Sequence, residues 1–146
     1  MGYNSHPARL SNASTQDNSN TMAVIRFILG RIILFFNWLF SPRSLARPAD
    51  AQARVDRLTD NLKLYHYEAC PFCVKVRREM KRQSLNIELR DVKRTVSAKE
   101  ELLAGGGRLK VPCLRIERDD GGTEWMYESS DIITYLHKTL ATAPAA

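Results

Sequence analysis

The sequence predicts an α/β domain in which helices flank a mixed, four-stranded sheet, with a hydrophobic helix in front of it. From residue 62 onward, strand-like and helix-like segments alternate in the order β-α-β-α-β-β-α. The first crossover indicates a parallel strand pair, and the Asp-Asp-Gly-Gly turn at 119–122 indicates an antiparallel hairpin, so we expect both pairings in one sheet. A separate apolar run occupies residues 22–40.

Length, charge and cysteine usage narrow the function classes. The chain has 146 residues, enough for one domain of ordinary size, and its composition is globular. Its net charge of +6 favours an anionic partner. The basic residues are scattered and no aromatic–basic recognition motif is visible, so we do not expect nucleic acid binding. Three cysteines are too few for a disulfide scaffold.

The apolar run at 22–40 is predicted to be a membrane-anchor helix. Nineteen helical residues rise about 28 Å, close to the ~30 Å hydrocarbon core of a bilayer. Placing Arg31, in the middle of the run, inside the bilayer costs about 2.5–3.5 kcal/mol. This cost offsets much of the free energy gained by inserting the apolar residues, so a spanning helix is near balance. A broad apolar face would equally suit a helix lying in the interface. A cleaved signal or a soluble packing helix are further readings of the same run.

The segments around this run are predicted to lack regular structure. Residues 1–21 are rich in Ser, Asn and Thr and, like residues 142–146, are expected to be disordered tails. Residues 41–61 are expected to be a linker with a short helix after Pro48. Only Arg9 precedes the run, whereas five cations follow it, which predicts that the C-terminal part faces the cytoplasm. These cations are Arg43, Arg47, Arg54, Arg57 and Lys63.

Residues 62–141 form the predicted α/β domain. We expect strands at 62–67, 86–92, 113–118 and 123–127, and helices at 71–83, 97–107 and 130–140. The Ser97 to Glu100 stretch fits a capping box, and the three glycines at 105–107 fit a helix end.

The stretch Cys70-Pro71-Phe72-Cys73 carries the predicted chemistry. A zinc site needs four ligands, and no second C-x-x-C is present. Iron–sulfur ligation shared between two chains stays open. A C-x-x-C that follows a strand and opens a helix is typical of a thioredoxin-like redox motif. There the unpaired amides and the helix dipole favour an anion, so Cys70 is predicted to be the attacking thiolate and Cys73 the resolving thiol.

Two further stretches, Lys110-Val111-Pro112 and the Glu-Ser-Ser-Asp sequence at 128–131, complete a family pattern. With the cysteine motif, they resemble the glutaredoxins and the related N-terminal domain of glutathione S-transferases, over about residues 63–140. The chain is also similar to the membrane-associated prostaglandin E synthases of type 2, which pair such a domain with an N-terminal hydrophobic segment. The resemblance implies a thioredoxin-like fold of the glutaredoxin type and glutathione as co-substrate.

The resemblance also implies specific roles for residues. The Val111–Pro112 peptide should be cis and lie opposite the active cysteine. The acidic and hydroxyl pair at the start of the last helix should bind the γ-glutamyl end of glutathione, while Ser129 or Ser130 also serves as N-cap. The residues expected to contact glutathione are Pro71, Phe72, Lys110, Val111, Pro112, Glu128, Ser129 and Asp131.

The expected function is that of a membrane-tethered, glutathione-dependent thiol–disulfide oxidoreductase acting on disulfide-bonded or glutathionylated proteins. Phe72 stands where Tyr is commoner in the family, and residues 141–146 do not supply the helical second domain of transferases. Transferase activity on bulky electrophiles is therefore not expected. The alternatives are a glutathione-binding or iron–sulfur-bridging module without turnover, or a glutathione-dependent isomerase at the membrane.

Several residues near the motif are expected to be structural. Cys113 is predicted to be a small buried residue on a strand, and His66 a strand or loop residue rather than a base. Trp125 and Tyr127 should pack on an edge strand. Lys75, Arg77 and Arg78 add positive potential near the motif, the last two as solvated charges on the helix face.

Overall fold

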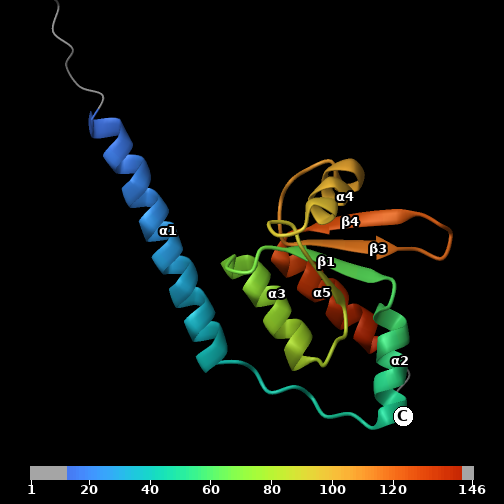
Figure 1. Cartoon of the computed structure of the whole chain (residues 1–146). Helices are drawn as coiled ribbons and strands as arrows, with labels where there is room; N and C mark the ends of the chain where they lie inside the picture. Colours follow the sequence, from blue (N-terminus) through green and yellow to red (C-terminus); the bar gives the residue numbers. More distant parts are fainter. Residues whose placement is uncertain (1–12, 143–146) are drawn as a thin grey trace, which may run out of the picture.

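The computed structural model describes residues 13–142 and confirms an α/β domain with a long helix beside it (Figure 1). In chain order the elements are α1 (Ala13–Leu39), α2 (Ala49–Thr59), β1 (Leu62–His66), α3 (Pro71–Arg82), β2 (Glu88–Asp91), α4 (Val96–Gly106), β3 (Cys113–Glu117), β4 (Thr123–Tyr127) and α5 (Ser129–Ala141). The predicted order of strands and helices from residue 62 is confirmed.

The sheet has the predicted mixed character. Its strand order is β2-β1-β3-β4. Strand β1 runs parallel to β2, with Leu64 opposite Leu89, and antiparallel to β3, with Leu64 opposite Leu114. Strand β4 continues the hairpin at the edge, with Trp125 opposite Arg115. The carboxyl ends of β1 and β2 therefore meet at one edge, where loops commonly build ligand sites.

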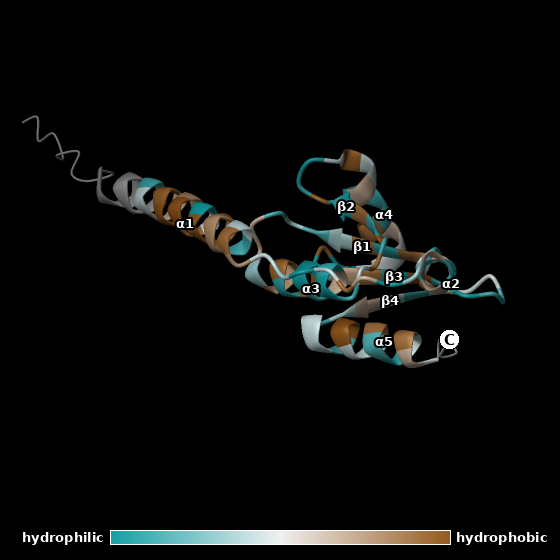
Figure 2. Ribbon diagram, turned by 90° about the horizontal axis from the view of Figure 1, so that it is seen from below, coloured by the Kyte–Doolittle hydropathy of each residue, from teal (hydrophilic) through white to brown (hydrophobic). Residues whose placement is uncertain are grey.

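Side chains that alternate along the central strands bury both faces of the sheet. Leu64 points toward the layer of α3 and α5, where it joins Val76 and Leu136 in the larger core cluster. Tyr65 points to the opposite face and packs with Leu102 of α4. Figure 2 shows this arrangement, with α4 on one side of the strands and α5 on the other. The order of layers holds β1, and so the loop that follows it, in a rigid position.

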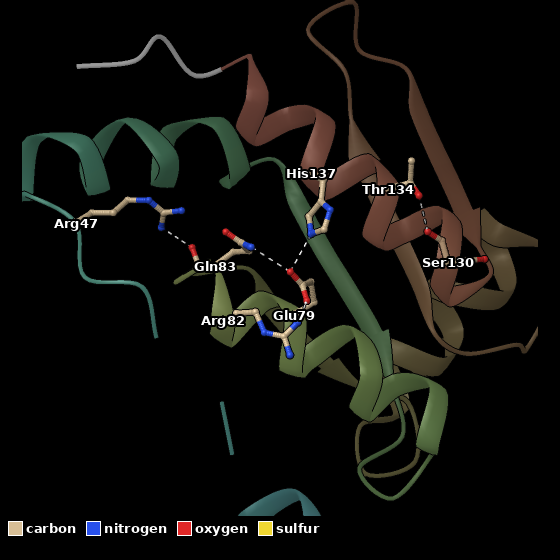
Figure 3. Close-up of polar contacts among 7 residues, drawn as sticks. All are labelled: Arg47, Glu79, Arg82, Gln83, Ser130, Thr134 and His137. Atoms are coloured by element: carbon tan, nitrogen blue, oxygen red, sulfur yellow. Dashed lines mark hydrogen bonds and ion pairs between the residues drawn. The ribbon is translucent and has the colours of Figure 1, made fainter. Parts of the chain in front are cut away.

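A buried carboxylate joins α3 to α5 (Figure 3). Glu79 on α3 lies 2.8 Å from Nε2 of His137 on α5, and its other oxygen accepts a hydrogen bond of 2.6 Å from Arg82. Gln83 donates a third hydrogen bond of 3.1 Å. Burial opposes the charge, yet the bonds from His137 and Gln83 and the charge of Arg82 keep the pKa of Glu79 below its ordinary value.

Helix α1 begins earlier than predicted. Residues 1–12 and 143–146, which include most of the two expected tails, lie outside the described residues. Residues 13–21, however, are helical rather than disordered. Extending an existing helix costs far less than nucleating one, so a polar stretch joined to an apolar helix can continue it. Asn20–Leu39 is long and apolar enough to cross a membrane, and none of its residues is fully buried.

Residues 41–61 are more ordered than a linker. The predicted helix after Pro48 is present as α2, and it buries Val55 and Thr59 against the domain. The preceding segment is hydrogen-bonded to the end of α3, from Leu45 N to Arg82 O at 3.1 Å and from Ser84 Oγ to Leu45 O at 2.6 Å. This segment fixes the point at which α1 leaves the domain.

Candidate functional site: two cysteines at the start of α3

The Cys-Pro-Phe-Cys stretch forms the turn from β1 into α3. Cys70 is the N-cap residue with an extended backbone, and Pro71 occupies the first turn, where a missing N–H costs nothing. Val74 N donates to Cys70 O at 2.9 Å, which closes the first helical turn. Cys70 is half-buried, whereas Phe72 is 62% exposed. The predicted placement of Cys70 at a helix N-terminus is confirmed.

Cys73 lies inside the first turn of the same helix. Its side chain is fully buried, and both cysteines are free thiols. Burial, together with the nearby Cys70, raises the pKa of the Cys73 thiol to about 12. Cys73 is therefore a neutral thiol at physiological pH, and Cys70 is the more accessible sulfur of the two. This difference agrees with the roles that the sequence assigned to them.

The segment before β3 carries the expected cis peptide. The Val111–Pro112 bond is cis, as the resemblance implied. Pro112 is buried, and Val111 packs on the cluster formed by Tyr65 and Cys113. Leu109, two residues earlier, lines the same cavity as Cys70. The segment before the cis proline and the cysteine turn therefore border one site.

The predicted γ-glutamyl site lies where β4 passes into α5. Lys110 and Glu128, both predicted to contact glutathione, form an ion pair across two loops. Glu128 is the N-cap residue, with a φ of 67°, and Ser129 is buried as the first helical residue. The expectation of Ser129 or Ser130 as N-cap was wrong, since the turn at Glu128 places both inside the helix. Asp131 is exposed in the first turn of α5.

The first helical residue of α4 also differs from the prediction. Thr95, not Ser97, precedes α4, and the hydrogen bond from Thr95 N to Asp91 O at 2.9 Å closes the turn that leads into it. At the other end Gly107 adopts a φ of 70°, as expected of a glycine that ends a helix.

A cavity of about 850 Å³ opens beside Cys70. One part of its wall carries three cations, Lys93 and Arg94 from the β2–α4 connection and Lys99 from α4. Another part is apolar, with Leu109 and, from helix α1, Leu34. The sequence analysis missed these five residues. The cations follow the carboxyl end of β2, and this position next to the carboxyl end of β1 was a usable signal.

Hydrogen bonds and an ion pair stabilise the cysteine turn and the neighbouring β2–α4 connection. Arg77 on α3 donates a hydrogen bond of 2.5 Å to the carbonyl of Glu68, and the Glu68 carboxylate pairs with Arg94. Asp91 accepts bonds from the backbone N–H groups of Lys93 at 2.9 Å and Arg94 at 3.1 Å. Arg77 is thus a half-buried positioning residue rather than the solvated charge that was expected. Both loops at this edge are fixed before any ligand binds.

Four residues that were expected to pack rather than to react lie in packed positions. Cys113 is fully buried, and burial raises its pKa to about 11. His66 is buried at the end of β1, where burial and the charge of Arg77 lower its pKa. Trp125 packs at a tilt against Tyr65, with ring centroids 5.3 Å apart, and Tyr127 donates a hydrogen bond of 2.8 Å to Gly106 O.

A comparison with known protein families shows which family this chain belongs to. The profile of the glutathione S-transferase N-terminal domain matches residues 64–144, which is more than half of the chain. The chain belongs to this family. The match to the glutathione S-transferase N-terminal domain includes most of β1, both cysteines, the cis proline and α5. The predicted fold and the expectation of glutathione agree with that membership. A search of curated proteins gave no significant match.

A solved structure is also similar to this transferase-type domain. It is a maleylacetoacetate isomerase from Anaeromyxobacter dehalogenans 2CP-1, crystallised with glutathione in its active site. The two sequences are 25% identical, and the TM-score is 0.43. The similarity covers 59% of this chain and 42% of the isomerase chain, so this chain spans less than half of that protein.

The site of the transferase-type domain can support thiol chemistry. It offers one accessible sulfur at a helix N-terminus and a second, buried sulfur within the same helical turn. Within residues 13–142, no group of three His, Cys, Asp or Glu side chains is arranged to hold a metal ion. The cavity beside Cys70 is lined by three cations, Lys93, Arg94 and Lys99, and by two carboxylates, Glu68 and Asp91, so its net positive charge suits an anionic ligand.

Proposed function

We propose that this protein is a glutathione-dependent thiol–disulfide oxidoreductase with Cys70 as its nucleophile. The observation that supports this most is the contrast between the two sulfurs of the motif. Cys70 is accessible at the start of α3, whereas burial raises the pKa of Cys73 to about 12. A nucleophile needs access and an anionic form, and a helix N-terminus stabilises the thiolate.

The proposed reaction balances as two thiol exchanges. The Cys70 thiolate attacks the glutathione sulfur of a glutathionylated protein, forms an S–S bond with it and releases the protein thiolate. A second glutathione thiolate then attacks the glutathione sulfur of this mixed disulfide. Oxidised glutathione leaves, and Cys70 returns as a thiolate. With a protein disulfide, the Cys70 thiolate attacks one substrate sulfur and forms a mixed disulfide, while the other substrate sulfur leaves as a thiolate. The Cys73 thiol then gives its proton to that thiolate and attacks the Cys70 sulfur, which releases the second substrate sulfur and leaves a Cys70–Cys73 disulfide. One glutathione opens this disulfide as a mixed disulfide with Cys70, and a second glutathione displaces Cys70 and leaves as oxidised glutathione.

Glutathione is proposed to lie between the cysteine turn and the start of α5. Its sulfur would face Cys70, its cysteine backbone would pair with Val111, and its γ-glutamyl end would meet Glu128 and Ser129. The positions of these residues support this orientation. Val111 precedes the cis proline, and Ser129 begins a helix whose first amides favour a carboxylate.

Helix α1 is proposed to tie this activity to a membrane. It exposes a long apolar surface, which a soluble protein would ordinarily bury. The cations that follow it in the sequence suit the anionic lipids of a cytoplasmic leaflet, which favours a cytoplasmic position for the redox domain.

The Cys70→Ser and Cys73→Ser variants test the assignment. We expect Cys70→Ser to lose deglutathionylation of a glutathionylated peptide by at least a hundredfold, and Cys73→Ser to retain most of it. Cys113→Ala, on the far side of the cis proline, is the control and should retain activity. Equal loss in both motif variants would instead indicate obligate dithiol chemistry. Full activity of Cys70→Ser, or an absorbance band near 420 nm with no turnover, would contradict the proposal.

A further inference from the structure

Helix α1 has one face turned toward the domain and one that faces away. Gly30, Ile33, Leu34 and Asn37 are half-buried, and their spacing of three and four residues places them on one side of the helix. The opposite side carries large apolar residues, each at least 44% exposed. They are Ile25, Ile28, Ile32, Phe35, Phe36 and Leu39. Figure 2 shows that hydrophobic residues recur along this helix.

The domain-facing side of α1 contacts the cysteine turn, the segment from β1 into α3 that carries Cys70. A Cβ added at Gly30 would lie 3.3 Å from the Cβ of Ala69, the residue directly before Cys70. Leu34, one turn farther along, lines the cavity beside Cys70. The glycine thus permits a close approach that a larger side chain would prevent. Helix α1 therefore lies beside the cysteine turn (Figure 1).

This contact is incompatible with a helix that crosses a bilayer. Gly30 lies at the middle of the apolar segment Asn20–Leu39, so in a spanning helix it would lie about 15 Å below the surface. Ala69 would be carried to the same depth, together with the charged side chains of Glu68 and Arg94 beside it. Charged groups on the surface of a folded domain do not enter the hydrocarbon core without a large cost.

We propose that α1 lies flat in the surface of an anionic membrane, with the cavity of Cys70 opening at the level of the lipid headgroups. The apolar side inserts, and the side with Gly30 stays on the domain. The inference deepens the proposed function, on which it rests, because it assigns as substrates disulfides and glutathionylated thiols carried close to a membrane surface. A disulfide far from the membrane would have to reach a site that the lipid and α1 partly cover.

Charge complementarity favours anionic lipid as the occupant of this surface. Three exposed cations, Lys93, Arg94 and Lys99, line the cavity next to Leu34 together with two carboxylates, Glu68 and Asp91. The charge near the plane in which α1 would insert is therefore net positive. Anionic headgroups attract such cations within about a Debye length. Arg26 falls on the domain-facing side of the helix, and Arg31 can extend its long side chain from the flank toward the headgroups.

Tryptophan depth measurements on the full chain distinguish a flat helix from a spanning one. Ile25, Ile32 and Leu39 are seven residues apart and lie on the same exposed side. Each would be replaced by Trp, one at a time, in a chain whose two native tryptophans are removed by Trp38→Phe and Trp125→Phe. Quenching by lipids brominated at different depths would be measured in vesicles of phosphatidylcholine with phosphatidylserine, and in vesicles of phosphatidylcholine alone.

A flat helix places the three tryptophans at the same shallow depth and binds the anionic vesicles at least tenfold more tightly. A deep tryptophan at position 32 with shallow tryptophans at positions 25 and 39 would show a spanning helix and overturn the proposal. So would binding that is equal in both vesicles, or self-association through this surface without lipid binding. The measurement does not depend on turnover, so an inactive Cys70 would contradict the proposed function and leave this inference standing.

Discussion

Lys110, on the loop before the cis proline, and Glu128, at the start of α5, form an ion pair across the predicted glutathione site. Both side chains are more than half exposed. Exposed pairs contribute about 0–1 kcal/mol, so a ligand can separate this one at little cost. The Glu128 carboxylate is therefore available to a cationic group of a ligand.

The first prediction concerns Glu128→Gln. If Glu128 binds the α-ammonium group of glutathione, its neutralisation removes a charge-assisted hydrogen bond of about 1 kcal/mol at an exposed site. The KM for glutathione should then rise about fivefold, with kcat nearly unchanged. Steady-state rates at varied glutathione concentration measure this. The matched control is Glu124→Gln, which removes a carboxylate paired with Arg118 on the distant hairpin. A similar effect of both variants would exclude a specific role for Glu128.

The second prediction concerns alkylation of the three thiols. Burial raises the pKa of Cys73 to about 12 and that of Cys113 to about 11, so both should resist iodoacetamide between pH 7 and 9. Mass spectrometry of native protein should find one label on the wild type and none on Cys70→Ser. The same variant unfolded in urea should take two labels, which controls for reagent activity. Labelling of native Cys70→Ser would show that a second thiol is accessible.

Local signals in the sequence were sufficient to predict the fold and the position of the cysteines at the centre of the site. Cys70 at the start of a helix follows from a short motif, whereas the cis peptide at Val111–Pro112 was implied by the family resemblance, and both are present. The order of strands and helices along the chain also followed, because turn residues and apolar periodicity indicate each element. Helix starts were less certain, since Thr95 and Glu128 precede their helices through turn geometry that no serine motif indicates.

The parts that the sequence did not indicate depend on contacts between distant segments. Leu34 and Lys99 meet at one cavity although they are far apart in the chain. Arg77 looked like a surface charge because its acceptor, the Glu68 carbonyl, belongs to a loop whose path depends on β1 and β2. Helical periodicity gives the faces of α1, but it does not reveal that Gly30 would meet Ala69.

The third prediction concerns the packing of α4 on the edge strand. Replacing a helical glycine by alanine usually stabilises a protein by up to about 1 kcal/mol. At Gly105, however, a Cβ would lie 2.7 Å from Cε2 of Trp125, a ring held against Tyr65. Gly105→Ala should therefore lower the free energy of unfolding by about 1–3 kcal/mol, as overpacking does.

Urea unfolding of a double-mutant cycle tests this explanation. In a Trp125→Ala background the ring is absent, so Gly105→Ala should be neutral or stabilising there. If alanine at position 105 were equally destabilising in both backgrounds, the contact with Trp125 would not be the cause.

The fourth prediction concerns stability at acid pH. The pKa of Glu79 lies below its ordinary value of 4.5, because the bonds from His137 and Gln83 and the charge of Arg82 outweigh burial. A carboxyl with a depressed pKa contributes stability above pH 4.5, and the contribution is lost as the pH falls through the native pKa. Glu79→Gln should cost about 1–2 kcal/mol at pH 7, and this difference from wild type should shrink below pH 4.5.

Urea unfolding between pH 3 and pH 7 would follow this difference. Glu100→Gln, at an exposed position on α4, is the matched control and should change stability by less than about 0.5 kcal/mol at any pH. A Glu79→Gln deficit that stayed constant down to pH 3 would mean that shape rather than charge at Glu79 joins α3 to α5. The deficit should instead disappear with the negative charge, because the protonated carboxyl of Glu79 and the amide of the variant both present His137 and Arg82 with a neutral group.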